Sequence, residues 1–322
     1  MAGITRRHFF FGSFAAAVAC RRPVQQAMSR FPAQQVSILG AGTYSADLTS
    51  VIRRILIEHR VDVAGKRVVL KPNLVEFSSK APINTHPVFV ASVAAAFHSL
   101  DAAEVRIAEG PGHRRMTLDL ASAAGYFETY PRFEQTFTDL NVDDVSRVEL
   151  RQQFSTLKEL YLPNTVLGCD LLVSVPKMKT HHWAGATLSM KNLFGVVPGA
   201  VYGWPKNVLH WAGINESIAD LHYLFPKQFS IVDGIEGMEG NGPILGTPKH
   251  AGVIVAGSHP PSVDATCCQI MQIDPSKIGY LDLIHRRSGW DANCIRQIGE
   301  RVASVSTPFA LIPDFADLRL HA

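Results

Sequence analysis

Residues 171–199 read LLVSVPKMKTHHWAGATLSMKNLFGVVPG. The first five residues are a short apolar run of the kind that forms a buried strand in a parallel sheet. The residues after it include three lysines, two histidines and a tryptophan, with no acidic residue among them. Ligands of α/β proteins bind at the carboxyl ends of strands. This segment therefore predicts an α/β fold with a cationic site at the end of a buried strand.

Short apolar runs alternate with helical patterns along the rest of the chain. Runs that predict buried parallel strands are residues 36–39, 67–70, 105–108, 171–175, 230–232 and 252–255. Helical patterns are residues 48–59, 87–100, 117–124, 208–224, 262–271 and 277–287. The alternation predicts an α/β protein with a mostly parallel sheet, helices on both of its faces, and two Rossmann-like lobes around a cleft.

One segment has a different residue pattern from the rest of the chain. Residues 147–150 and 157–162 are charged, alternating runs that predict an edge hairpin or a small inserted sheet. We expect the α/β domain to span residues 36–322 and its two lobes to divide near residues 133–170.

Composition excludes several classes of protein. The chain has 322 residues, of which 47% are hydrophobic and 18% charged, as in folded globular proteins rather than disordered, collagen-like or coiled-coil ones. Two of its 31 basic residues are Arg6 and Arg7, which leaves 29 basic against 28 acidic residues. Because the remaining net charge is close to zero, no nucleic-acid partner is expected.

The N-terminus has the pattern of an export signal. Arg6 and Arg7 precede an uncharged run, residues 9–19, which is too short to span a bilayer and ends in Ala-Val-Ala. Paired arginines before Phe-Phe resemble the twin-arginine signal, whose machinery exports folded proteins. The alternative is the basic start of a surface helix. We expect a signal at residues 1–20, a linker at residues 21–35, and a periplasmic or other extracytoplasmic location.

Cysteine positions leave two questions open. Cys20 follows the Ala-Val-Ala directly, so the chain either is cut there to leave a free thiol or carries a lipid on Cys20. That lipid and the signal are the only membrane contacts expected. Cys267 and Cys268 could form a vicinal disulfide, but an apolar helical setting favours two buried thiols. The chain has five cysteines and no C-x-x-C pair, so neither a zinc site nor an iron–sulfur cluster is expected.

Polar residues follow two of the predicted strands. Lys71 and Asn73 come at the end of the second strand and can both donate hydrogen bonds to a carboxylate or phosphate. His113 and Arg114 lie in a glycine-containing loop after the third strand and offer a titratable imidazole and a forked cation. A turn with a surface lysine is the alternative for Lys71.

The segment after residue 175 is the richest in candidates. Lys177, Lys179 and Lys191 predict a pocket for an anion, and a lysine crowded by others has a lowered pKa that suits a nucleophile. The alternative is a solvated basic loop. His210 follows as a candidate metal ligand or a packing histidine. Residues 233–243, with four glycines and three acids, predict a loop that covers a ligand or faces a metal, or else a flexible surface loop.

These motifs resemble one family in particular. Lys71-Pro72-Asn73, residues 176–179, Met190-Lys191-Asn192, Pro198-Gly199 and residues 233–243 occur in the order seen in the family called domain of unknown function 362. The resemblance spans residues 36–299. That family has no single settled activity, so the resemblance implies a fold and a site without naming a reaction.

A more distant resemblance concerns the chemistry. Gly112-His113-Arg114, His181 before Ala184-Gly185, and Lys191 ten residues after His181 are similar to motifs of the nickel-pincer lactate racemases. The resemblance implies that His113 and His181 are an acid/base pair and that Lys191 carries the pincer cofactor, beside Asn192 and Gly199. His210 would complete the nickel site, and racemisation would pass a hydride to the cofactor and back.

Three hypotheses follow. The first is an exported isomerase or oxidoreductase that uses a nickel pincer nucleotide or another divalent metal on a small carboxylate or related anion. Its substrate would be held by the lysines and by Asn73 and Arg114. The second is an extracytoplasmic protein that binds an anion or a metal without catalysis, and the third is an electron-transfer or metal-handling accessory protein.

Overall fold

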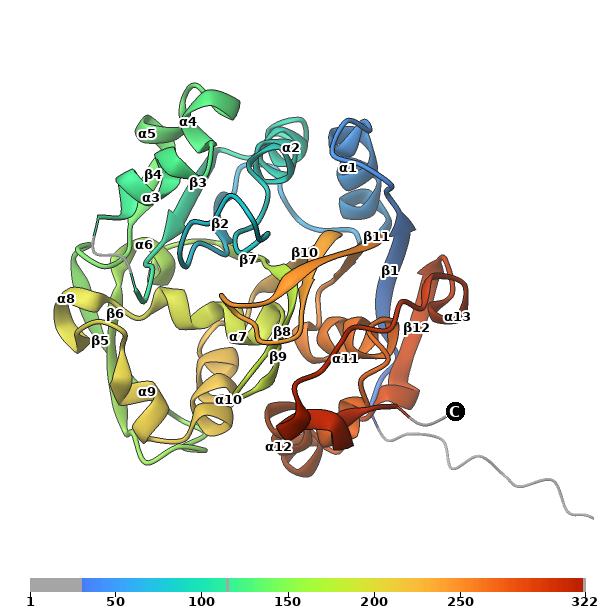
Figure 1. Ribbon diagram of the computed structural model, residues 1–322. Helices are drawn as coiled ribbons and strands as arrows, with labels where there is room; N and C mark the ends of the chain where they lie inside the picture. The colour runs from blue at the N-terminus through green and yellow to red at the C-terminus, as the bar shows by residue number, and fades with distance from the viewer. Residues whose placement is uncertain (1–30, 114–115, 321–322) are drawn as a thin grey trace, which may run out of the picture.

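The computed structural model describes residues 31–113 and 116–320. The main element is one ten-stranded, mostly parallel sheet with helices on both faces, as predicted (Figure 1). Eight strands follow the order β12-β1-β11-β10-β7-β2-β3-β4, and β8 and β9 extend from β10. The strands of this sheet are β1 (Gln34–Gly40), β2 (Arg67–Pro72), β3 (Glu104–Glu109), β4 (Phe137–Asp139), β7 (Leu171–Val175), β8 (Lys177–His181), β9 (Gly185–Thr187), β10 (Gln228–Glu239), β11 (Thr247–Gly257) and β12 (Ile295–Gly299).

Helices cover the two faces in two groups. On one face lie α1 (Leu48–Glu58), α2 (Pro87–His98) and α3 (Thr117–Ala123). On the other lie α7 (Ser189–Asn192), α10 (Ile214–Leu224), α11 (Pro260–Ile270) and α12 (Gly279–Ser288). The two groups lie above and below the sheet in Figure 1. Shorter helices are α4 (Tyr126–Thr129), α5 (Phe133–Thr136), α6 (Asn164–Leu167), α8 (Gly199–Tyr202), α9 (Asn207–Trp211) and α13 (Val302–Val305).

Alternation along the strands builds a hydrophobic core on each face. In β2, Val69 packs into the core beneath α7, α10 and α11, whereas Val68 and Leu70 pack into the core beneath α1 and α2. This follows from the two-residue period of a strand, which turns successive side chains to opposite faces. Both cores are needed because a parallel sheet buries both of its faces.

Helix α1 shows why the amphipathic segments become helices. Its buried residues Leu48, Ile52, Ile55 and Leu56 recur at the three- and four-residue spacing that places them on one face. The Asp47 side chain accepts a hydrogen bond from the Ser50 N–H and so caps the first turn. The α1 residues belong to the hydrophobic core on this face of the sheet.

Three predictions about individual elements are wrong in part. Residues 252–255 lie in β11, which runs antiparallel to both β1 and β10. The long helix expected over residues 208–224 is two helices, because Gly213 between α9 and α10 has a φ of 101°, which a helix does not accommodate. Most of the loop expected at residues 233–243 is strand: β10 continues to Glu239, and Gly237 lies where an added Cβ would be 2.8 Å from the Met178 carbonyl oxygen.

The predicted hairpin is confirmed, whereas the two sides of the expected division share one sheet. Strands β5 (Val145–Glu149) and β6 (Glu159–Pro163) form a separate antiparallel pair. Strands from before and after residues 133–170 belong to the same main sheet, since β7 pairs with both β2 and β10.

The cysteines and the termini complete the description. Cys267 and Cys268 are free thiols buried in α11, so the prediction of buried thiols is confirmed. Within residues 31–113 and 116–320, no helix has the length and apolar character needed to cross a bilayer. The export signal predicted for residues 1–20, Cys20 and most of the linker lie outside the described residues.

Candidate functional site

The floor of the site is a buried ion pair between two neighbouring strands. Parallel strands β2 and β3 lie side by side, and their carboxyl ends carry Lys71 and Glu109. The Lys71 Nζ donates to Glu109 Oε2 at 2.5 Å, and each side chain is 1% exposed. Lys71 also donates to the Pro72 carbonyl oxygen and to Asn192 Oδ1, both at 2.9 Å. All three donors of its ammonium group are therefore used within the protein.

Glu109 is fully engaged as well. Its carboxylate accepts hydrogen bonds from the Leu74 N–H at 3.0 Å and the Gly110 N–H at 2.8 Å. An added Cβ on Gly195 would overlap Glu109 Oε1 and Lys71 Nζ, so only glycine fits over the pair. Burial lowers the pKa of the Lys71 amine, and the Glu109 charge opposes that effect. The pair is thus a structural support of the site rather than a free anion-binding group.

Helix α7 places Lys191 at the site. The Asp264 carboxylate accepts from the Ser189 N–H at 2.8 Å and the Met190 N–H at 3.1 Å, which fixes the start of this short helix. Lys191 Nζ lies 3.7 Å from the centre of the Phe194 ring. Burial, followed by the charges of Lys71 and Lys206, lowers the pKa of the Lys191 amine to about 7.

The segment that sequence reasoning takes for a loop is a short hairpin, β8–β9. Lys179 and His181 are on β8, two residues apart, and both are buried. His181 Nδ1 accepts from the Trp183 N–H at 3.0 Å and the Ala184 N–H at 3.2 Å. The ring is then neutral with its proton on Nε2, and burial followed by the Lys191 charge lowers the pKa of His181 well below its ordinary value. His181 therefore presents a fixed N–H donor.

Lys206 is a member of the site that the sequence analysis missed. Its amine is buried and donates to the Gly110 carbonyl oxygen at 2.5 Å and to the Gly195 carbonyl oxygen at 3.5 Å. Its backbone has a φ of 66°, an unfavourable region for a lysine. Burial lowers the pKa of the Lys206 amine to about 7. Only the position of a lysine after Trp204-Pro205 marks it in the sequence.

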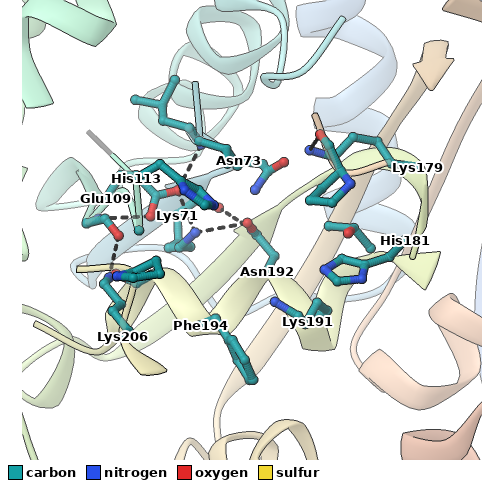
Figure 2. A pocket seen from close by; sticks show the side chains of 18 of the residues that line it. Lys71, Asn73, Glu109, His113, Lys179, His181, Lys191, Asn192, Phe194 and Lys206 are labelled. Carbon is teal, nitrogen blue, oxygen red and sulfur yellow. Dashed lines mark hydrogen bonds and ion pairs between the residues drawn. The ribbon is translucent and has the colours of Figure 1, made fainter. Parts of the chain in front are cut away.

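These groups surround one cavity of about 100 Å³. Figure 2 shows Lys179, His181 and Lys191 on one side of it, and Lys71, Glu109 and His113 on the other. The described residues around it include four lysines and three histidines, with Glu109 as the one carboxylate. The cavity is therefore rich in positive charge and in hydrogen-bond donors, which suits a small anion.

Three polar atoms at the cavity lack partners among the residues that the structure describes. They are Asn73 Oδ1, Thr187 Oγ1 and His210 Nδ1. His210 packs edge-on to the rings of Trp183 and Phe194, and burial lowers its pKa to about 4. A buried polar atom without a partner costs roughly 1–3 kcal/mol, so such atoms normally bind water or a ligand. The cavity thus contains acceptors for a bound molecule as well as cations.

Most of the residues predicted for the site meet at this cavity. Lys71, Asn73, His113, Lys179, His181, Lys191, Asn192 and His210 all line it. Lys177 does not: its amine lies 2.6 Å from Asp233 Oδ2 and 2.9 Å from the Tyr44 hydroxyl, at a second pocket. Arg114 lies outside the described residues.

Gly199 also lies away from the cavity lining and has a packing role. Its N–H donates to Asn141 Oδ1 at 2.8 Å, and an added Cβ would lie 2.5 Å from the Trp204 ring. The contacts of Gly199 therefore show a steric requirement for glycine at this position.

Fold and site together define an α/β protein with a lysine-lined pocket at the carboxyl ends of parallel strands. Comparison of the sequence with known protein families identifies the family. Residues 68–269 match the family described as domain of unknown function DUF362, and the chain belongs to that family.

Known relatives and solved structures resemble the chain to different degrees. The thylakoid-associated protein sll1697 of Synechocystis sp. is 28% identical over 264 residues, which are 76% of this chain and 77% of that protein. The lactate racemase apoprotein from Thermoanaerobacterium thermosaccharolyticum gives a TM-score of 0.47 at 12% identity, over 74% of this chain and 57% of that one. A protein from Thermotoga maritima gives 0.38 at 13% identity, over 71% and 59%. This chain spans less than two thirds of either solved protein.

The nickel-pincer group does not fit the cavity. Lys191 offers an amine and His210 Nδ1 an unpartnered nitrogen, which are the types of group such a cofactor needs. A ligand of nucleotide size, however, needs a pocket of roughly 300–1,000 Å³, and this cavity is about 100 Å³. Among the described residues, no three His, Cys, Asp or Glu side chains gather as a metal site either. The function is therefore derived below from the chain's own side chains.

Proposed function

We propose that this protein is an enzyme that binds a small carboxylate in the lysine-lined cavity and moves protons on it. The observation that carries the proposal is the composition of the cavity lining: among the described residues, four lysines and three histidines line it together with a single carboxylate, Glu109. That carboxylate is occupied by Lys71 and two backbone N–H groups. The cavity of about 100 Å³ suits a molecule of a few heavy atoms, such as a 2-hydroxy or 2-oxo acid.

Lys191 and Lys206 are the groups we assign to the carboxylate. The pKa of each amine is lowered to about 7, so each is close to half protonated at neutral pH. A bound anion favours the charged form and raises both pKa values. Binding above pH 7 should therefore take up protons from the solvent.

His181 and His113 are the groups we assign to proton transfer. His181 holds its proton on Nε2, so it can donate to a substrate oxygen. Burial lowers the pKa of His113, which favours the neutral ring that can accept a proton. The two histidines lie on opposite sides of the cavity in Figure 2, an arrangement that suits proton transfer on two sides of one carbon.

Exchange of substrate hydrogen with solvent tests this proposal. The full-length protein is incubated in D₂O with lactate, glycolate, malate or pyruvate, and loss of C–H signal is followed by NMR. We expect enzyme-dependent exchange of at least one of them, and a loss of roughly a hundredfold or more in His181→Gln. His98→Gln, an exposed residue at the end of α2, is the matched control and should exchange at the wild-type rate.

Carboxylate binding without exchange of any compound would overturn the enzyme proposal and favour an anion-binding protein. Absence of both binding and exchange would overturn the assignment of the cavity as a carboxylate site.

Export is the second part of the proposal. Arg6 and Arg7, the uncharged run after them and Cys20 support a folded, extracytoplasmic protein with a cleaved signal or a lipid on Cys20. The name of the thylakoid-associated relative is in line with a location outside the cytosol. Fractionation of cells that express the chain should find the mature protein outside the cytosol, and Arg6→Lys with Arg7→Lys should leave the precursor inside.

A further inference from the structure

Lys179 differs from Lys71, the other lysine on a strand of this cavity, in its hydrogen-bond partners. Its side chain is completely buried on β8. Its amine donates to two backbone carbonyl oxygens, Ile83 O at 2.7 Å and Pro243 O at 3.3 Å. Within the described part of the chain, these two uncharged oxygens are all the acceptors it has.

The number of hydrogen-bond acceptors around Lys179 equals the number of N–H donors of a neutral amine. A lysine ammonium has three N–H donors, whereas the neutral amine has two and a lone pair. Lys71 has three acceptors, one of them the Glu109 carboxylate, and these favour the charged ammonium form. Lys179 has two carbonyl acceptors, and the remaining direction at its nitrogen is left for the lone pair. Burial and the charges of Lys177, Lys191 and Lys71 all lower the pKa of Lys179.

The other two lysines of the cavity suit the charged form better. Lys191 lies over the face of the Phe194 ring, where the π electrons attract a cation. Lys206 donates to two carbonyl oxygens, as Lys179 does, but the charges of Glu109 and Asp139 oppose the effect of burial on its pKa and so favour the charged form. In Figure 2 Lys179 and Lys191 lie on the same side of the cavity with His181 between them, and the amine of Lys179 is turned inward towards Asn73. One small molecule in the cavity can therefore contact both a cation and a neutral amine.

We propose that Lys179 is a nucleophile that condenses with the carbonyl group of a small 2-oxo acid to form an imine. This inference rests on the proposed function and names its substrate class. The carboxylate of the 2-oxo acid would be bound by Lys191 and Lys206, which places the adjacent carbonyl carbon towards Lys179.

The side chains of the cavity supply every proton that the reaction needs. The Lys179 nitrogen forms a bond to the carbonyl carbon while the carbonyl π electrons move to oxygen, which takes the Nε2 proton of His181. One amine proton returns to His181, and the other leaves with the hydroxyl group as water when the C–O bond breaks. The two protons of the amine thus end in one water molecule, and His181 finishes as it began.

Reductive trapping tests the assignment. The full-length protein is incubated with pyruvate and sodium cyanoborohydride, and the adduct is located by mass spectrometry of whole protein and peptides. We expect one adduct per chain, on Lys179 of the wild type, absent from Lys179→Arg and retained in the exposed control Lys227→Arg. Because the wild-type peptide map locates the adduct directly, the result stands even if Lys179→Arg does not fold.

The pH dependence of trapping adds a second measurement. A lysine of ordinary pKa loses roughly a hundredfold of its neutral form between pH 8 and pH 6. For Lys179 the trapping rate should fall much less than that over the same range, because burial and the neighbouring lysines lower its pKa. A hundredfold fall would overturn the assignment.

The remaining outcomes separate this inference from the proposed function. An adduct on Lys191 or Lys206 would overturn the role of Lys179 and leave the carboxylate site intact. Pyruvate that binds by calorimetry without forming any adduct would overturn the imine while the proposed function stands. Pyruvate, lactate, glycolate and malate that neither bind nor react would overturn both.

Discussion

Replacement of Glu109 by glutamine tests the structural floor of the site. Lys71 and Glu109 are each 1% exposed, so the charge that remains has no access to water. The carboxylate accepts from Lys71 Nζ and the Leu74 N–H on one oxygen and from the Gly110 N–H on the other. Glutamine has a single acceptor oxygen, so its amide N–H₂ must face at least one of these donors.

The expected loss of stability is large for one substitution. Removal of one partner of a buried ion pair costs about 3–5 kcal/mol, against a typical stability of about 5–15 kcal/mol. Urea unfolding followed by far-UV circular dichroism should therefore show a free energy of unfolding lower by about 3–5 kcal/mol for Glu109→Gln. In Lys71→Met/Glu109→Gln the loss should be less than the sum of the single losses by roughly 0.5–3 kcal/mol. A loss below about 1 kcal/mol in Glu109→Gln would refute a charged, unhydrated pair.

Three further outcomes follow from individual contacts. Gly195→Ala should unfold at least about 1–3 kcal/mol more easily in urea, since its Cβ would overlap the Lys71–Glu109 pair, whereas Gly42→Ala, with open space, should change little. Burial lowers the pKa of His259 to about 4, so this ring stays neutral in the folded chain while the unfolded chain takes up a proton below about pH 6.5. Stability should therefore fall as pH drops from about 6.5 to about 4, and His259→Asn should reduce that fall by on the order of 1–2 kcal/mol in unfolding titrations. Lys177→Met should leave the calorimetric affinity for carboxylates unchanged, because that amine pairs with Asp233 away from the cavity; a tenfold loss would place it in the site.

Position at strand ends explains why much of the site could be predicted. Lys71 lies at the end of β2, Asn73 follows it, and His113 follows the parallel neighbour β3, so the carboxyl ends of the two strands bring these residues together. The density of cations after β7 predicts Lys191 and His181 as site residues. The sheet class itself followed from short apolar runs separated by amphipathic helices such as α1.

Long-range partners explain what the sequence could not show. Lys177 and Lys179 are two residues apart on β8, so the sequence does not distinguish between them. Asp233 of β10, however, lies beside Lys177 and pairs with its amine away from the cavity. Lys206 bonds to carbonyl oxygens, which every residue carries, so no residue pattern marks its partners. The antiparallel direction of β11 did have a signal: only residues 240–246 separate it from β10, too few for a parallel crossover.

Calorimetric titration of lactate and pyruvate tests the carboxylate site most directly. Binding is measured at pH 7.5 in two buffers of different ionisation enthalpy, with wild type and Lys191→Met. We expect saturable binding with proton uptake, because the anion raises the pKa of Lys191 and Lys206 from about 7, and a smaller uptake with at least tenfold weaker binding in the variant. Absence of binding, or binding with neither proton uptake nor dependence on Lys191, would contradict the assignment of this cavity as a carboxylate site.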